Sequence, residues 1–128
     1  MNKQNTEKLL KDFPSLYKQY YLPMEQTCMC WGFEVDDGWF NIIYKLSTDL
    51  MKVNSECEAC QVKEKFGGLR FYTDNLNEEG HKLIEWAEKM SFSICEVCGS
   101  PGKLYTEKWY KTLCEKCKEK DGKKKSRM

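Results

Sequence analysis

This sequence has little histidine, no surplus of charge of either sign and no long hydrophobic run. The single histidine, His81, leaves no Ser-His-Asp or Cys-His constellation, and the chain carries neither a P-loop nor a glycine-rich dinucleotide-binding motif. Its 21 basic and 20 acidic residues nearly balance, so bulk charge does not favour binding to nucleic acid or membranes. We therefore expect a non-enzymatic protein more than an enzyme.

The lack of hydrophobic runs also bears on location. The N-terminus contains no apolar core of signal-peptide length, and no later run is long enough to cross a bilayer. We therefore expect a cytoplasmic protein with no membrane partner. Because thiols stay reduced in the cytoplasm, the eight cysteines indicate metal ligands before they indicate disulfides.

Four of these cysteines have the spacing of a zinc ribbon. Cys95 and Cys98 are followed by Gly99, and Cys114 and Cys117 repeat the two-residue spacing after a further fifteen residues. Two thiolates three positions apart can bind one ion from a tight turn, and glycine permits the positive φ of that turn. Four sulfurs around one Zn²⁺ leave no open position, so we predict a structural zinc site. Free or disulfide-bonded cysteines are the alternative.

The other four cysteines predict a second zinc site. Cys28 and Cys30 precede a predicted helix, and Cys57 and Cys60 follow it. A second Zn²⁺ held by these four would join the loop before the helix to the strand after it. The alternatives are two pairs of partly buried thiols, or redox sensing by Cys57 and Cys60.

Hydrophobic periodicity predicts helices before the zinc ribbon. Apolar residues recur every three or four positions over residues 5–21, 39–52 and 75–90. Pro14 interrupts the first of these segments, which predicts a kink or two short helices.

Residues 59–73 alternate polar and apolar side chains, as a β-hairpin does. Gly67 and Gly68 fit a two-residue hairpin turn, and a glycine bulge within one long strand is the competing interpretation. The fold class is therefore predicted as α+β. We expect a small helical domain with a central hairpin at residues 1–92, a four-cysteine zinc ribbon at 93–119 and a disordered basic tail at 120–128.

The predicted hairpin also carries a candidate binding surface. Lys63, Lys65 and Arg70 share its polar face with Tyr72. Cations interleaved with an aromatic ring suit a phosphate and a base, or an acidic protein surface.

An acidic turn precedes the second predicted helix. Asp36 and Asp37 are candidates for the same binding surface, but together with Glu34 they could instead neutralise the hairpin cations in a fixed ion-pair network. Trp39 and Phe66 are expected in the core rather than as rings that stack on a ligand.

Three motifs together resemble a known family. The string Q-V-K-E-K-F-G-G-L-R-F-Y-T lies between a D-G-W-F turn and a C-x-x-C-G-x-P-G…T-L-C-x-x-C module. This arrangement, from Phe33 to Lys118, resembles an uncharacterised family of small zinc-ribbon proteins from bacteriophages, prophages and bacterial genomes. The resemblance implies a phage or prophage setting and no established activity. The second set of four cysteines is not part of the family pattern.

These observations predict a non-enzymatic zinc-binding interaction protein whose partner is a host protein, with inhibition of a bacterial defence or regulatory protein as the specific hypothesis. The first alternative is a zinc-ribbon nucleic-acid-binding protein, with a basic stripe formed by Lys63, Lys65, Arg70, Lys103, Lys108, Lys111 and the C-terminal K-K-K-S-R. The second alternative is a nucleotide-binding or nucleotide-sequestering protein, which requires a pocket between the hairpin and the acidic turn.

Overall fold

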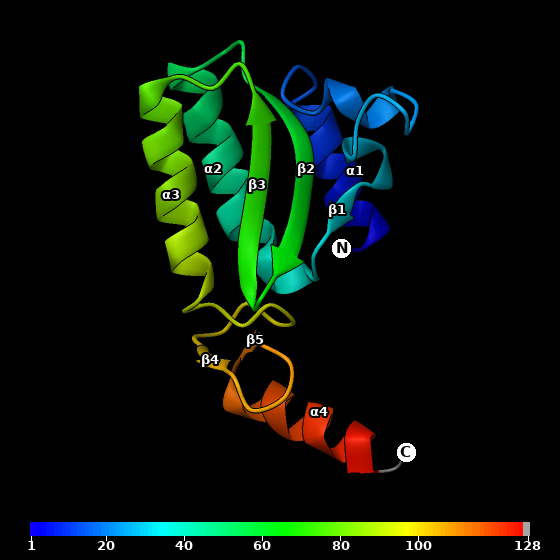
Figure 1. The fold of residues 1–128 in the computed structure, drawn as a ribbon, viewed down its shortest axis with the longest axis vertical. Helices are drawn as coiled ribbons and strands as arrows, with labels where there is room; N and C mark the ends of the chain where they lie inside the picture. The colour runs from blue at the N-terminus through cyan, green and yellow to red at the C-terminus, as the bar shows by residue number, and fades with distance from the viewer. Residues whose placement is uncertain (127–128) are drawn as a thin grey trace.

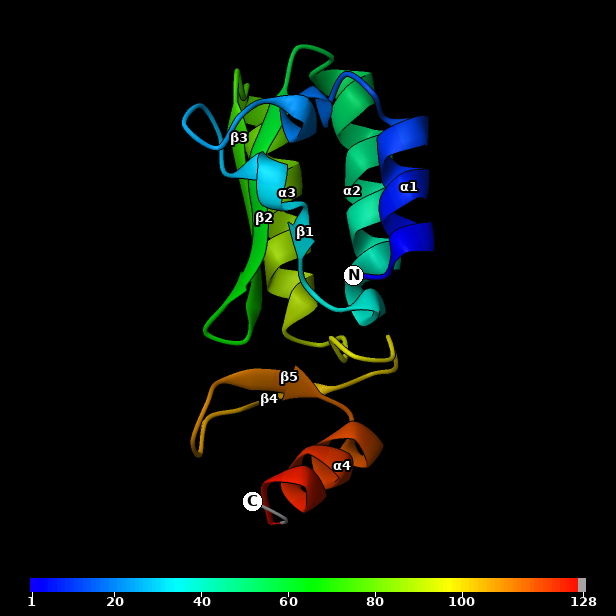
Figure 2. The same ribbon diagram turned by 90° about the vertical axis from the view of Figure 1, so that its right-hand side faces the viewer.

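The computed structural model describes residues 1–126, with side chains through residue 121. It confirms the α+β class: a three-stranded sheet has helices on one face, and a small hairpin-and-helix module lies beyond one end of the sheet (Figures 1 and 2). The α-helices are α1 (Lys3–Asp12), α2 (Phe40–Val53), α3 (Glu78–Ser91) and α4 (Glu115–Ser126). The strands are β1 (Phe33–Glu34), β2 (Glu58–Lys65), β3 (Gly68–Asp74), β4 (Lys103–Tyr105) and β5 (Lys111–Leu113). Short 3-10 helices occupy Lys18–Tyr21, Met29–Trp31 and Asp37–Trp39.

The main sheet has the order β1-β2-β3, with β1 parallel to β2 and β2 antiparallel to β3. Val62 pairs with Phe71, and both are buried against the helices. Lys63 pairs with Arg70 one position along, so these two side chains lie on the opposite face of the sheet. Figure 2 shows that the helices leave this second face uncovered.

The hairpin turn differs by one residue from the predicted one. Lys65 pairs with Gly68, so the two turn residues are Phe66 and Gly67, with φ of 54° and 86°. Two positive φ values at a two-residue turn fit the twist of a hairpin. Gly68 belongs to the strand, where a Cβ would lie 2.3 Å from the Phe92 ring.

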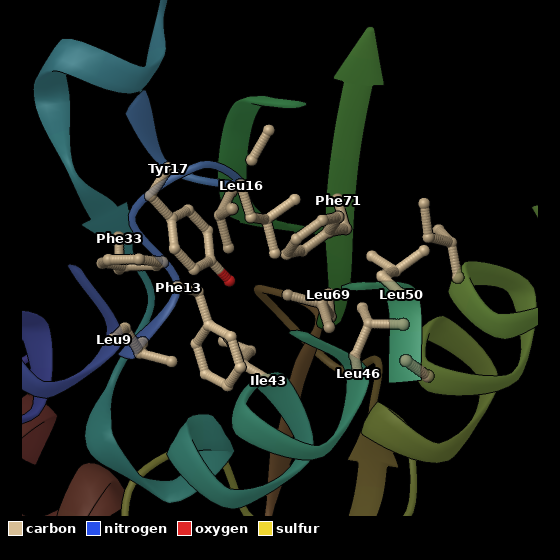
Figure 3. Packing of buried hydrophobic residues seen from close by; sticks show 14 of the residues in the cluster. Leu9, Phe13, Leu16, Tyr17, Phe33, Ile43, Leu46, Leu50, Leu69 and Phe71 are labelled. Carbon is tan, nitrogen blue, oxygen red and sulfur yellow. The ribbon is translucent and has the colours of Figure 1, made fainter. Parts of the chain in front are cut away.

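The core lies between the sheet and helices α1 and α2. Figure 3 shows its central side chains, namely Leu9, Phe13, Leu16, Tyr17, Phe33, Ile43, Leu46, Leu50, Leu69 and Phe71. The buried hydroxyl of Tyr17 is hydrogen-bonded to Ser47 of α2, which satisfies both polar groups. Trp39 is fully buried, as the sequence predicts. The break near Pro14 is also present, since α1 ends at Asp12.

The C-terminal segment is more ordered than its composition indicates. Helix α4 continues to Ser126, so residues 120–126 are helical, whereas the sequence predicts a disordered tail. Lys111 of β5 forms an ion pair with Asp121 at 3.0 Å, which joins the helix to the small hairpin. Residues 127 and 128 of the expected tail lie outside the described residues.

Candidate metal centre and binding surface

The structure brings together the four cysteines of the predicted ribbon. The sulfur atoms of Cys95, Cys98, Cys114 and Cys117 all lie within 4.8 Å of one another, so the group could hold a metal ion. The Sγ atoms of Cys98 and Cys114 are 3.6 Å apart. Four thiolates bound tetrahedrally at about 2.3 Å from Zn²⁺ would be about 3.8 Å apart, so the observed distance fits such an ion.

Secondary structure positions each pair of these sulfurs. Cys95 and Cys98 flank a tight turn that ends at Gly99, whose φ is 82°. Cys114 follows β5, and Cys117 lies in the first turn of α4, where its amide donates to the Cys114 sulfur. The turn after Ile94 thus supplies Cys95 and Cys98, and the segment at the start of α4 supplies Cys114 and Cys117.

The electrostatics of the cluster favour a bound cation. Hydrogen bonds from the side chain and backbone of Ser100 lower the pKa of Cys98 to about 6. Burial and the neighbouring sulfurs raise the pKa of Cys117 to about 12. Four thiolates this close repel one another, so a divalent cation is the chemistry that lets all four ionise together.

The second predicted zinc site is not assembled. The four-cysteine group of the ribbon is the single place, among side chains through residue 121, where three or more potential metal ligands gather. Cys57 is 1 % exposed and burial raises its pKa, whereas Cys28 is exposed and Cys60 lies at a bulge in β2. Cys57 is buried just before β2, so these cysteines do not form a four-ligand group.

The D-G-W motif serves as a docking point for the metal module. The amide of Gly38 donates to the carbonyl of Glu96 at 2.7 Å, and the indole of Trp39 donates to the carbonyl of Ile94 at 2.9 Å. A Cβ at Gly38 would lie 2.1 Å from the carbonyl oxygen of Cys95. Glycine is therefore required for the turn that carries the first two cysteines to reach this distance.

The F-G-G motif forms a second docking point. The hydroxyl of Thr112 in β5 donates to the carbonyl of Gly67 at 2.7 Å, in a buried position. A Cβ at Gly67 would lie 2.5 Å from Leu104 of β4. Two motifs of the sequence thus hold residues 93–119 against residues 1–92, through backbone and side-chain hydrogen bonds to backbone carbonyls.

Both residues of the acidic turn form hydrogen bonds with other parts of the chain. The carboxylate of Asp37 accepts hydrogen bonds from the amide of Asn2 and from the side chain of Asn5, which attaches the start of α1. The amide of Asp36 donates to the Glu96 carboxylate. Burial raises the pKa of Glu96 to about 7. These contacts give Asp37 a structural role in holding the start of α1.

Of the acidic residues, Glu34 pairs with Lys63 across β1 and β2, whereas Asp36 and Asp37 follow the end of β1. Lys65 is exposed, and Lys63 and Arg70 are half-buried on the uncovered face of the sheet beside Tyr72. Among the described side chains, no ion pair includes any of the three cations, so the alternative of an ion-pair network is not formed.

The hollow next to Tyr72 does not provide the nucleotide pocket that one hypothesis requires. Lys63 and Tyr72 line it with Gln61 and Asp74, and it contains neither Asp36 nor Asp37. Asp36 lines a different cavity, beside Glu96.

Three exposed aromatic residues lie outside the predicted site. The sequence predicts Phe66 in the core, but its side chain is 63 % exposed at the hairpin tip. Trp109 and Tyr110, in the connection between β4 and β5, are 73 % and 47 % exposed. Had the turn been placed one residue earlier in the sequence, at Phe66 and Gly67, the sequence would have predicted Phe66 at the exposed tip.

No family model, curated protein or solved structure matches this chain. The functional conclusion therefore depends on the geometry of the metal centre and of the uncovered face. Within residues 1–126, no helix has the length and apolar character needed to span a bilayer.

Proposed function

We propose that this chain is a non-enzymatic zinc-binding protein that contacts an anionic macromolecule through the uncovered face of its sheet. Zn²⁺ is the proposed ion because a group of four closely spaced cysteine thiolates is typical of structural zinc sites. The ion would hold the turn at Cys95 and the start of α4 in place, and so support the module that contacts the hairpin tip.

The observation that carries this proposal is the arrangement of hairpin cations. Lys63 and Arg70 lie directly opposite each other on neighbouring strands, and like charges in that position destabilise a sheet. No carboxylate forms an ion pair with them among the described side chains. Although Glu34 of β1 is the neighbour of Lys63, two adjacent cations that form no ion pair are well placed to bind an anionic partner.

One candidate partner is an acidic surface of a host protein. The resemblance to phage and prophage proteins supports this setting, with a bacterial defence or regulatory protein as the inhibited target. Cytoplasmic location belongs to the same hypothesis.

The second candidate partner is nucleic acid, and the distribution of charge favours it. Residues 93–128 contain ten lysines and arginines against five acidic residues, whereas residues 1–92 contain eleven against fifteen. The balanced net charge therefore conceals a basic C-terminal module, although four thiolates around one Zn²⁺ would remove part of its positive charge.

Affinity purification from bacterial lysate tests the proposal. We expect the tagged, zinc-loaded chain to retain an anionic macromolecule, and the variant Lys63→Ala/Lys65→Ala/Arg70→Ala to lose it at unchanged melting temperature. The matched control is Lys52→Ala/Lys82→Ala/Lys89→Ala, which removes three exposed lysines from α2 and α3. Equal retention by both variants would contradict the proposal, as would a large loss of stability in the first.

A further inference from the structure

We infer that the anionic partner is single-stranded nucleic acid, and that its bases stack on an aromatic corner formed by Phe66, Trp109 and Tyr110. This inference rests on the proposed function and names the partner class for the same face. It adds a binding site at the hairpin tip that the cations alone do not define.

The aromatic corner combines Phe66 of the β2–β3 turn with Tyr110 of the β4–β5 connection and with Trp109, the exposed residue that precedes Tyr110 in the chain. The ring centroids of Phe66 and Tyr110 are 6.2 Å apart, at an interplanar angle of 67°. The Thr112 hydrogen bond to Gly67, one residue after Phe66, holds the two segments in contact. The side chain of Lys65 reaches the same place, with its Nζ 5.6 Å from the Phe66 centroid. A cation and aromatic rings are therefore exposed together.

The backbone at Phe66 indicates that this ring has a function outside the core. Phe66 adopts a φ of 54°, a conformation that is unfavourable for a bulky residue and suits asparagine or glycine at this turn position. Its ring is mostly exposed, so burial does not offset the strain. Strained backbone conformations are concentrated at active sites and ligand-binding sites.

The corner continues into the basic face of the sheet. From the tip, the uncovered face presents Lys65, then Lys63 beside Arg70, and then Tyr72 beside Gln61. The β2–β3 turn and the β4–β5 connection project to the same side as this face (Figure 2). Rings at one end and unpaired cations along the rest match the stacking platforms and charged grooves that bind single strands.

A single strand fits this surface better than a duplex or a protein. Exposed rings can stack only on bases that are free of a helix, and the bases of a duplex are stacked on one another. An acidic protein would use the cations but would not require a strained, exposed ring at the tip. Binding of a protein or of duplex alone is therefore a contrary outcome of the test.

Fluorescence anisotropy with labelled single-stranded oligonucleotides tests the inference. Full-length, zinc-loaded protein is titrated into oligothymidylate, oligouridylate and a duplex of equal length. We expect Phe66→Asn and Trp109→Ala each to weaken single-strand binding by roughly 5- to 150-fold, the range of base–aromatic stacking. Phe66→Asn should leave the melting temperature unchanged or raise it, because asparagine tolerates the left-handed turn.

The matched control is Trp86→Ala, which removes an exposed ring from α3 on the helical side of the sheet. We expect it to bind as the wild type does. Removing Lys63, Lys65 and Arg70 should reduce the slope of log K against log salt by about 2, since each phosphate contact contributes about 0.7 on a single strand.

Two results would overturn the inference. One is the absence of single-strand binding at low salt by protein that is folded and zinc-loaded. The other is binding that Phe66→Asn and Trp109→Ala leave unchanged. If a protein partner were instead lost in the cation variant, the proposed function would stand and the nucleic-acid inference would fail.

Discussion

At Gly38, the backbone of the sheet domain approaches the metal module more closely than any side chain would permit. A Cβ there would meet the carbonyl oxygens of Cys95 and Glu96 at 2.1 and 2.4 Å. Both obstacles are backbone atoms on the turn that supplies metal ligands, so neither can move without moving the ligands. A glycine in the D-G-W motif thus connects the acidic turn to the metal site.

We therefore predict that Gly38→Ala lowers the free energy of unfolding by about 1–3 kcal/mol, the usual cost of forcing extra volume into a packed contact. Urea unfolding of the zinc-loaded protein measures this loss. The matched control is Gly80→Ala in α3, where the added methyl group meets only the ends of Asn54, Leu76 and Leu50 side chains. A smaller loss at Gly38 than at Gly80 would contradict the docking of the metal module at this glycine.

Among the secondary-structure elements, the small hairpin of β4 and β5 makes the contact with the tip of the large one. Thr112 is fully buried, and its hydroxyl is the hydrogen-bond donor to the Gly67 carbonyl. Its own carbonyl accepts from the amide of Glu96, so β5 also supports the turn that holds the cysteines. One strand therefore joins the metal site to the proposed aromatic corner.

Replacing this hydroxyl tests the link. Thr112→Val keeps the shape of the side chain but leaves the buried Gly67 carbonyl without its donor, so we expect a loss of about 1–3 kcal/mol in urea unfolding. Thr48→Val in α2 is the control, because its hydroxyl donates to a carbonyl four residues earlier in the same helix. Equal losses in the two variants would argue against a stabilising contact at the hairpin tip.

The elements that the sequence predicts well are those specified by local pattern. The helices follow hydrophobic spacing, and the spacing of Cys95, Cys98, Cys114 and Cys117 is enough to place one metal site. The predicted hairpin turn is wrong by one residue. Whether the turn is formed by Gly67 and Gly68 or by Phe66 and Gly67 depends on a contact that is distant in sequence. Gly68 meets the ring of Phe92, which no local pattern reveals.

Three other differences between sequence and structure have the same origin. The sequence does not show that Cys57 is buried, and cysteine spacing by itself allows Cys57 and Cys28 to share a zinc site. The end of the chain has the composition of a polar tail, but the ion pair between Lys111 and Asp121 connects α4 to β5. Phe66 is predicted in the core because aromatic residues usually lie there. Its exposure follows from the turn, not from its side chain.

In the whole molecule, the metal site supports the proposed binding face. The module that contains the four cysteines contacts the sheet domain at Gly38 and at Gly67. Because a structural metal site couples binding to folding, its loss should loosen the module and separate Tyr110 from Phe66. The uncovered face would keep its cations and Phe66 but lose Trp109 and Tyr110 from the aromatic corner.

Native mass spectrometry of protein purified under reducing conditions with zinc tests the single metal site most directly. We expect one zinc ion per chain, lost in Cys95→Ser/Cys98→Ser and retained in the matched variant Cys28→Ser/Cys60→Ser. Zinc that remained bound in the first variant, or a second ion that disappeared in the other, would contradict the assignment of a single site to Cys95, Cys98, Cys114 and Cys117.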